Sequence, residues 1–156
     1  MFNQLSFRGF AFLFLIFGFM IFSPNTSFAK STIYSSYFGN IAINGTDTVA
    51  YFTEGKAVDG SPEFTYQWNE ANWQFSSAKN RDAFATNPKK YAPQFGGYCA
   101  WAVSQGYSAS TIPEAWTIVE GKLYLNYSRT VRSQWSKNIP GNIAKAEQNW
   151  PRVLGN

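Results

Sequence analysis

The sequence lacks histidine and is poor in sulfur. It contains 156 residues, no histidine and one cysteine, Cys99, and its two methionines, Met1 and Met20, both lie within residues 1–29. Proteins hold zinc, copper and haem iron mainly through histidine, cysteine and methionine, so the absence of histidine and methionine beyond residue 29 removes most of the usual ligand sets for these metals. The absence of histidine also excludes a Ser-His or Cys-His catalytic set and a histidine general base. Because no paired carboxylates and no glycine-rich phosphate loop stand out either, we expect a protein that is not an enzyme.

Residues 1–29 have the features of a secretory signal peptide. Arg8 is their only charged residue, residues 9–22 form an uncharged and largely apolar run, and Pro24 interrupts it. The small residues of "SFA" predict cleavage after Ala29, which would leave the protein periplasmic or secreted. The alternative is an uncleaved membrane anchor, but the run is shorter than the roughly 20 residues that a spanning helix needs. We therefore expect no stable membrane insertion after cleavage.

The charge balance is only weakly basic. The chain has 13 Lys and Arg against 9 Asp and Glu, a formal net charge of +4, and the basic residues are scattered rather than clustered. This pattern does not favour a nucleic-acid partner. A lone cysteine in an oxidising compartment has no internal disulfide partner. Cys99 is therefore expected to be buried, bound to a ligand, modified, or paired with another molecule.

The first half of the mature chain combines strand and helix patterns. Residues 30–40 are polar and are expected to form a flexible lead-in. Asn44-Gly45 is typical of a turn, and residues 54–64 form a loop punctuated by glycine and proline. Aromatic and polar residues alternate at 64–68, as in a strand. The predicted elements are a β-prone run at 48–52, a hairpin of strands 64–68 and 72–77, a helix at 78–85 capped by Ser76 or Ser77, and a short helix from Pro88 through Tyr91.

The second half predicts a further hairpin followed by helices. Two β-rich runs within residues 115–127 flank Glu120-Gly121, which suits a tight turn. Ser128 can cap the next helix, Pro140-Gly141 is expected to break it, and Pro151 is expected to end the last helix. The order of elements predicts a small α+β domain with short antiparallel hairpins and several short helices, extended by a C-terminal hairpin and two helices.

Long stretches of the chain carry a family resemblance. The phrases "FSSAKNRDAFATNPKKYAPQFGGYCAWAVS", "GKLYLNYS" and "IPGNIAKAEQNWP" resemble the YHS-domain family, and more closely its exported bacterial members with a single YHS domain. The resemblance covers residues 41–154 and implies a core at 45–92 with an extension at 93–154. It implies a periplasmic accessory protein and leaves the ligand unnamed.

Some relatives in this family use cysteines to hold soft metals, and the resemblance locates the matching positions here. Their Asp-Pro-Val-Cys and Tyr-Phe-Cys-Ser-x-x-Cys patterns place thiolates where this chain has Ala50, Ser76 and Asn80. The metal role of those positions is therefore not carried over. The exported members that this chain resembles typically have Gly-Tyr-Asp-Pro at the first strand, whereas this chain has Gly-Thr-Asp-Thr around Asp47.

Three interpretations of Cys99, in the stretch "FGGYCAWAVSQGY", stay open. It is a buried small hydrophobe against Tyr98 and Trp101, since free cysteine is often buried. Alternatively, it belongs to a ligand site with Asp47, Tyr51, Tyr98 and Trp101, or it binds a copper-type metal ion, with a second Cys99 from a homodimer completing the ligand set. Finally, it is a redox-active thiol, for which a nearby cation or helix end would be needed.

The function expected from these observations is binding. We expect an exported, non-catalytic accessory protein that binds a small ligand or a periplasmic partner protein. The alternatives are a copper-handling protein that uses Cys99 and a thiol-dependent redox protein.

Overall fold

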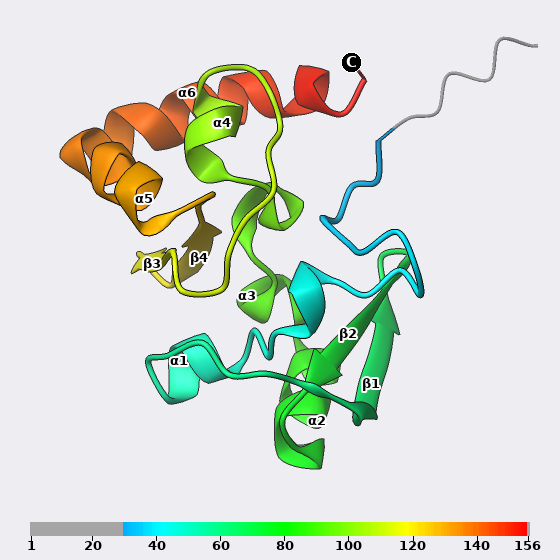
Figure 1. Cartoon of the computed structure of the whole chain (residues 1–156). Coiled ribbons are helices and arrows are strands. Elements are labelled where there is room, and N and C mark those ends of the chain that lie inside the picture. The colour runs from blue at the N-terminus through cyan, green and yellow to red at the C-terminus, as the bar shows by residue number, and fades with distance from the viewer. Residues whose placement is uncertain (1–29, 156) are drawn as a thin grey trace, which may run out of the picture.

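The computed structural model describes residues 30–155, so the predicted signal peptide at 1–29 lies outside the described residues. Short helices and two separate two-stranded antiparallel sheets make up the fold, which confirms the α+β prediction (Figure 1). The elements of the first half are η1 (Ile43–Gly45), α1 (Ala50–Thr53), β1 (Ser61–Trp68), β2 (Ala71–Phe75), α2 (Ala78–Thr86), α3 (Pro88–Tyr91) and η2 (Gln94–Gly97). Those of the second half are α4 (Ala100–Ser104), β3 (Trp116–Val119), β4 (Lys122–Leu125), α5 (Arg129–Trp135), η3 (Ser136–Asn138) and α6 (Ile139–Val153). None of the helices among these residues is both long enough and apolar enough to cross a bilayer.

The main core lies between the two hairpins. The β1–β2 hairpin and α2 lie at one end of the molecule, and α6 runs across the other end beside α4 (Figure 1). Phe84 of α2 packs on Trp73 and Phe75 of β2, with ring centroids 4.8 and 5.0 Å apart. Leu123 and Leu125 of β4 belong to the same buried cluster. The main core therefore contains residues both of the predicted core at 45–92 and of the predicted extension at 93–154.

Local capping explains where several helices begin. The Ser77 hydroxyl accepts from the Asn80 N–H, the Asn87 side chain accepts from the Lys90 N–H, and the Ser128 hydroxyl accepts from the Val131 N–H. These caps satisfy backbone donors that have no partner inside the helix. The predicted starts of α2, α3 and α5 are thus confirmed, as is the turn at Glu120-Gly121.

The middle of residues 30–40, which were predicted to form a flexible lead-in, is packed against the rest of the fold. Ile33 is 3% exposed and joins the main core. The Tyr34 N–H donates to the Gly96 carbonyl at 2.8 Å, and Ser35 pairs with Ala42 in an isolated bridge. These contacts hold the middle of the segment against the rest of the fold.

The strand predicted at residues 48–52 is wrong, because this segment contains helix α1. The Asp47 carboxylate accepts from the backbone N–H groups of Val49 and Ala50, at 3.0 and 3.2 Å. An acidic side chain just before a short apolar run is typical of a helix start, and here it outweighs the β propensity of Val49 and Tyr51. The structure also extends β1 back to Ser61, into the predicted loop, with a shift of register between Ser61 and Thr65.

The predicted limits of the last helix are also wrong. Helix α6 contains Pro140 and Gly141 in its first turn, and it continues through position 151 to Val153. Proline is tolerated in a first turn because its missing N–H would have no helical partner there. Asn138 caps this turn by accepting from the Gly141 N–H at 3.1 Å.

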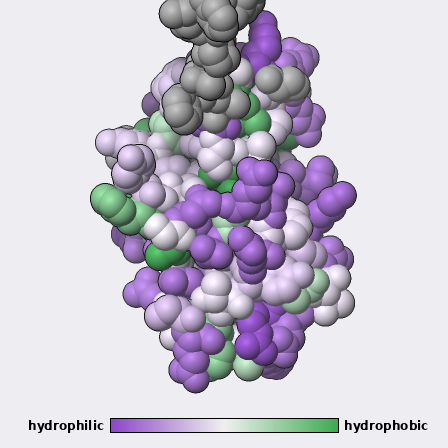
Figure 2. Space-filling view, turned by 90° about the vertical axis from the view of Figure 1, so that its right-hand side faces the viewer, coloured by the Kyte–Doolittle hydropathy of each residue, from purple (hydrophilic) through white to green (hydrophobic). Residues whose placement is uncertain are grey.

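The face of the molecule in Figure 2 is mostly hydrophilic, with hydrophobic residues in small separate groups. Tyr37 and Phe38 are the most exposed large hydrophobic side chains of the described residues, at 94% and 82%. Their rings contact each other edge to face, 5.1 Å apart.

Candidate functional site

Cys99 lies at the start of α4, directly after a sharp backbone bend at residues 95–97. Phe95, Gly96 and Gly97 all have positive φ, at 54°, 60° and 85°. A Cβ on Gly96 would collide with the Thr32 carbonyl oxygen, and one on Gly97 would collide with the Ile43 side chain. Close packing against Thr32 and Ile43 is therefore sufficient to require the Gly-Gly pair.

Cys99 is buried among backbone and amide groups. The residue is only 1% exposed, and its Sγ lies 3.7 Å from Asn126 Oδ1. The Tyr127 N–H donates to Sγ at 3.3 Å, and the Cys99 N–H donates to the Ala109 carbonyl at 3.0 Å. Asn126 Oδ1 also accepts from the Trp101 N–H at 3.2 Å, while Asn126 Nδ2 is buried without a partner in residues 30–155.

A cavity of about 230 Å³ lies against this cysteine. Two tyrosines in its wall, Tyr107 and Tyr127, are each 54% exposed. The wall carries no charged side chain and is formed by Cys99, Trp101, Ala102, Tyr107, Ala109, Tyr127 and Val131. Cys99 and Trp101, two of the predicted site residues, thus meet at one cavity; we call it the Cys99 cavity.

The other two predicted aromatics lie in packed surroundings away from this wall. The Tyr51 hydroxyl donates to the Pro113 carbonyl at 2.8 Å, and burial, with a smaller contribution from Glu114, raises its pKa above the usual value. The Tyr98 hydroxyl donates to the Ser31 carbonyl at 2.9 Å, and its pKa is raised by burial first and by Tyr34 second. Both phenols are held as neutral donors, which suits a structural role.

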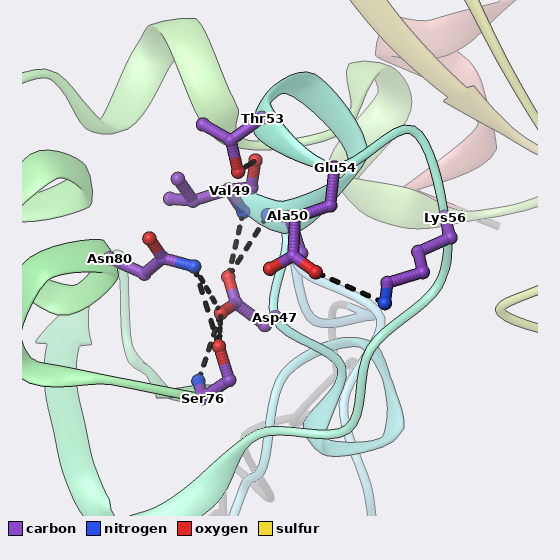
Figure 3. A network of polar contacts seen from close by, with 8 residues as sticks. All are labelled: Asp47, Val49, Ala50, Thr53, Glu54, Lys56, Ser76 and Asn80. Atoms are coloured by element: carbon purple, nitrogen blue, oxygen red, sulfur yellow. Dashed lines mark hydrogen bonds and ion pairs between the residues drawn. The ribbon is translucent and has the colours of Figure 1, made fainter.

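Asp47 forms a second polar centre (Figure 3). It is fully buried, and its Oδ1 accepts from the Val49 and Ala50 N–H groups. Its Oδ2 accepts from the Ser76 N–H at 2.9 Å, from the Ser76 hydroxyl at 2.6 Å, and from Asn80 Nδ2 at 2.7 Å. Five hydrogen bonds thus compensate the buried carboxylate, and no cation among the described residues pairs with it.

The Asp47 network joins three segments of the chain. It connects the start of α1 to the residue after β2, Ser76, and to Asn80 on α2. The ion pair in Figure 3 between Glu54 and Lys56, at 3.2 Å, lies on the exposed side of α1 and does not reach the carboxylate. With every acceptor position engaged, the network suits cross-linking better than ligand binding.

The donors near Cys99 do not fit a copper-type ion. Cu(I) prefers sulfur ligands, and zinc takes four. Sγ has one amide oxygen nearby, at 3.7 Å, and a backbone N–H that points at the sulfur. In residues 30–155 no group of three or more Cys, Asp or Glu side chains is placed to hold a metal. A second Cys99 could reach this sulfur only if the covering residues moved, so the shared site in a homodimer stays a prediction.

Sequence reasoning missed most of the wall of the Cys99 cavity. Tyr127 lies in this wall 28 residues beyond Cys99, and it reaches the sulfur, with Asn126 before it, because both directly follow β4. Ala109 and Tyr107 return to Cys99 because the chain turns back after α4. A sequence signal for this return exists in Gly106, whose φ of 89° ends the helix.

The three positions matched to thiolates in the sequence analysis, Ala50, Ser76 and Asn80, meet in the structure. The N–H of Ala50, both donors of Ser76 and the amide of Asn80 all point at Asp47. The chain matches no family model, no curated protein and no solved structure.

Proposed function

We propose that the protein is a non-catalytic binding protein that takes a small, neutral, monocyclic aromatic ligand in the Cys99 cavity. The observation that carries this proposal is the cavity itself: about 230 Å³, bordered by Trp101 and two half-exposed tyrosines, with no charged side chain in its wall. Largely apolar concave sites with a few polar groups are the usual form of small-molecule sites.

The site is open to solvent, so its volume limits how much of a ligand it can bury. Sites for drug-sized molecules span about 300–1,000 Å³, and an apolar cavity of about 150 Å³ takes benzene. A cavity of about 230 Å³ therefore suits one ring with a small substituent. Tyr107 and Tyr127 offer faces for ring contacts and hydroxyl groups for one hydrogen bond.

Binding is favoured over catalysis by the groups around the thiol. A reactive cysteine needs a neighbouring base, cation or helix N-terminus. Cys99 is the N-cap residue of the short helix α4, but its side chain makes no cap hydrogen bond to that helix, and among the described residues Sγ has only an amide oxygen and the Tyr127 N–H beside it. The signal-like residues 1–29 and the resemblance to exported single YHS-domain proteins support an accessory role in the periplasm.

The test uses the chain that begins at Lys30, with p-cresol as the probe. In a ¹H–¹⁵N NMR titration we expect saturable shifts of the backbone amides of Ala109 and Tyr127. Ala109→Leu places a larger side chain in the cavity wall, and it should weaken binding at least about tenfold because the lost ring volume cannot be recovered elsewhere. Ala144→Leu, on the exposed face of α6, is the matched control and should bind as the parent does.

Shifts that do not saturate, or that cluster away from Cys99, would contradict the proposal. So would an Ala109→Leu variant that is folded and binds p-cresol as tightly as the parent. The NMR map of the parent protein is decisive by itself if Ala109→Leu fails to fold.

A further inference from the structure

A second cleft lies between the two hairpins, on a different part of the surface. It measures about 410 Å³ and is bounded by Trp68 at the end of β1, Lys89 of α3, residues 92–95, and Lys122 at the start of β4. Helix α3 lies between the β1–β2 and β3–β4 hairpins, which places this cleft at their junction (Figure 1). We call it the lysine cleft. It shares no residue with the wall of the Cys99 cavity.

The lysine cleft has a single sign of charge. Lys89 and Lys122 are exposed, and no acidic side chain borders the cleft. The ion pairs found within residues 30–155 join Lys56 to Glu54 and Arg81 to Asp82, so neither cleft lysine is neutralised by such a pair. Two uncompensated ammonium groups at one concave site raise the local concentration of anions.

The same cleft has an aromatic and apolar wall. Trp68 and Phe95 are only partly buried, while Ala92 and Pro93 beneath them are buried. Trp68 is held in place by Trp73 and Phe84, with ring centroids 5.7 and 5.8 Å away. A supported indole with a free surface offers a stacking or edge contact to a planar ring.

The backbone that carries Phe95 into this wall is held in an uncommon conformation. Phe95 has φ 54° and ψ 37°, which is unfavourable for an aromatic residue, and the collision that a Cβ would cause at Gly96 shows how tightly the bend is packed. The aromatic wall is therefore preformed, and a ligand would not have to organise it.

We propose that the lysine cleft binds a small planar aromatic carboxylate. The ring contacts Trp68 and Phe95, and the carboxylate lies toward Lys89 and Lys122. A volume of about 410 Å³ accommodates a bicyclic ring with its carboxylate. The charge of the ligand separates this site from the Cys99 cavity, whose wall has no charged group, so the two proposals stand or fall independently.

The test is an NMR titration of the chain that begins at Lys30, with 2-naphthoate as the probe and 2-naphthalenemethanol as its neutral counterpart. We expect saturable shifts of the Trp68 indole N–H and of the amides of residues 94–95. The affinity for naphthoate should fall severalfold between roughly 20 mM and 300 mM salt, because both lysines are exposed and screened. The alcohol should bind at least about threefold more weakly than naphthoate, as loss of exposed charge pairs implies.

Variants then assign the charge effect to the cleft. Lys89→Glu/Lys122→Glu should weaken naphthoate binding at least about fivefold and leave the alcohol unaffected within about twofold. Lys137→Glu/Lys145→Glu changes the net charge equally at exposed positions outside the cleft and should leave naphthoate binding unchanged within about twofold.

Three results would overturn the proposal. They are no saturable shift at Trp68, equal affinity for the acid and the alcohol, or equal weakening by the two double variants. If Lys89→Glu/Lys122→Glu does not fold, Lys89→Gln and Lys122→Gln tested singly keep the comparison, and each should weaken binding by about twofold.

Discussion

Replacing Asp47 by asparagine tests whether its charge holds the N-terminal half together. The change is nearly isosteric, but it replaces one carboxylate oxygen by an NH₂ donor. The residue is fully buried and surrounded by five donors, two on Oδ1 and three on Oδ2. Asparagine is expected to keep its oxygen at the three-donor side. Its NH₂ then faces the N–H groups of Val49 and Ala50, which lose their acceptor.

The structure sets the size of the effect. Two hydrogen bonds to a charged acceptor are worth about 1.5–3 kcal/mol each, which gives about 3–6 kcal/mol for the pair that is lost. The neutral amide recovers part of the desolvation cost of the carboxylate. We therefore expect the free energy of unfolding to fall by about 3–5 kcal/mol, a large share of the roughly 5–15 kcal/mol available to a domain.

Urea unfolding of the chain from Lys30, followed by tryptophan fluorescence, measures this difference. Asp59→Asn is the control, because Asp59 is exposed and should change stability by no more than about 0.5 kcal/mol. Ser76→Ala, made alone and together with Asp47→Asn, completes a double-mutant cycle, and a coupling of at least about 0.5 kcal/mol is expected for residues in contact. A loss below about 1 kcal/mol for Asp47→Asn would refute the view that the carboxylate cross-links the fold.

Further predictions concern Tyr51, Cys99 and Gly96. Burial raises the Tyr51 pKa, so the neutral phenol stabilises the fold below about pH 10 and this contribution is lost as pH rises above that value. In unfolding curves recorded from about pH 8 to 11, Tyr51→Phe should lessen this decline in stability. At neutral pH the same variant should cost about 1 kcal/mol, because the hydrogen bond to the Pro113 carbonyl is lost. Cys99 should react with a thiol reagent at least about tenfold more slowly in the native protein than in denaturant, because it is 1% exposed; equal rates would contradict its burial. Gly96→Ala should lower the free energy of unfolding by more than about 2 kcal/mol, because the residue has positive φ and its new Cβ would collide with the Thr32 carbonyl. Gly121 also has positive φ but faces open space, so Gly121→Ala should cost only about 1 kcal/mol. Similar losses for the two variants would show that the collision at Gly96 does not contribute.

Local chemistry in the sequence predicted the parts of the fold that depend on neighbouring residues. Ser77, Asn87 and Ser128 cap helices by bonding backbone groups three residues away, and the Glu120-Gly121 turn needs only its own backbone. The segment after Asp47 was predicted as a strand from its β propensity, although the Asp47 carboxylate accepts from N–H groups only two and three residues further on. The part that local chemistry could not predict is the bonding of the same carboxylate to Ser76 and Asn80, which are 29 and 33 residues distant.

The candidate site could be predicted only in part, for the same reason. Cys99 and Trp101 are neighbours on the bend and the first turn of α4, so their proximity follows from the sequence. Tyr127 reaches the cavity through β4, and Val131 reaches it through α5. The lysine cleft had no sequence signal at all, because Lys89 and Lys122 come together only when the two hairpins pack around α3.

The Asp47 network also bears on the three positions that the sequence analysis matched to thiolates, where a metal role was not carried over. A metal held by thiolates joins chain segments through one centre of charge surrounded by ligands from several elements. Here a carboxylate is that centre, and the groups at Ala50, Ser76 and Asn80 are hydrogen-bond donors directed at it. A cation placed among them would face the N–H and NH₂ groups that now point at the carboxylate, and each would lose its acceptor. The same arrangement that stabilises the negative charge of Asp47 therefore opposes a metal ion at this position.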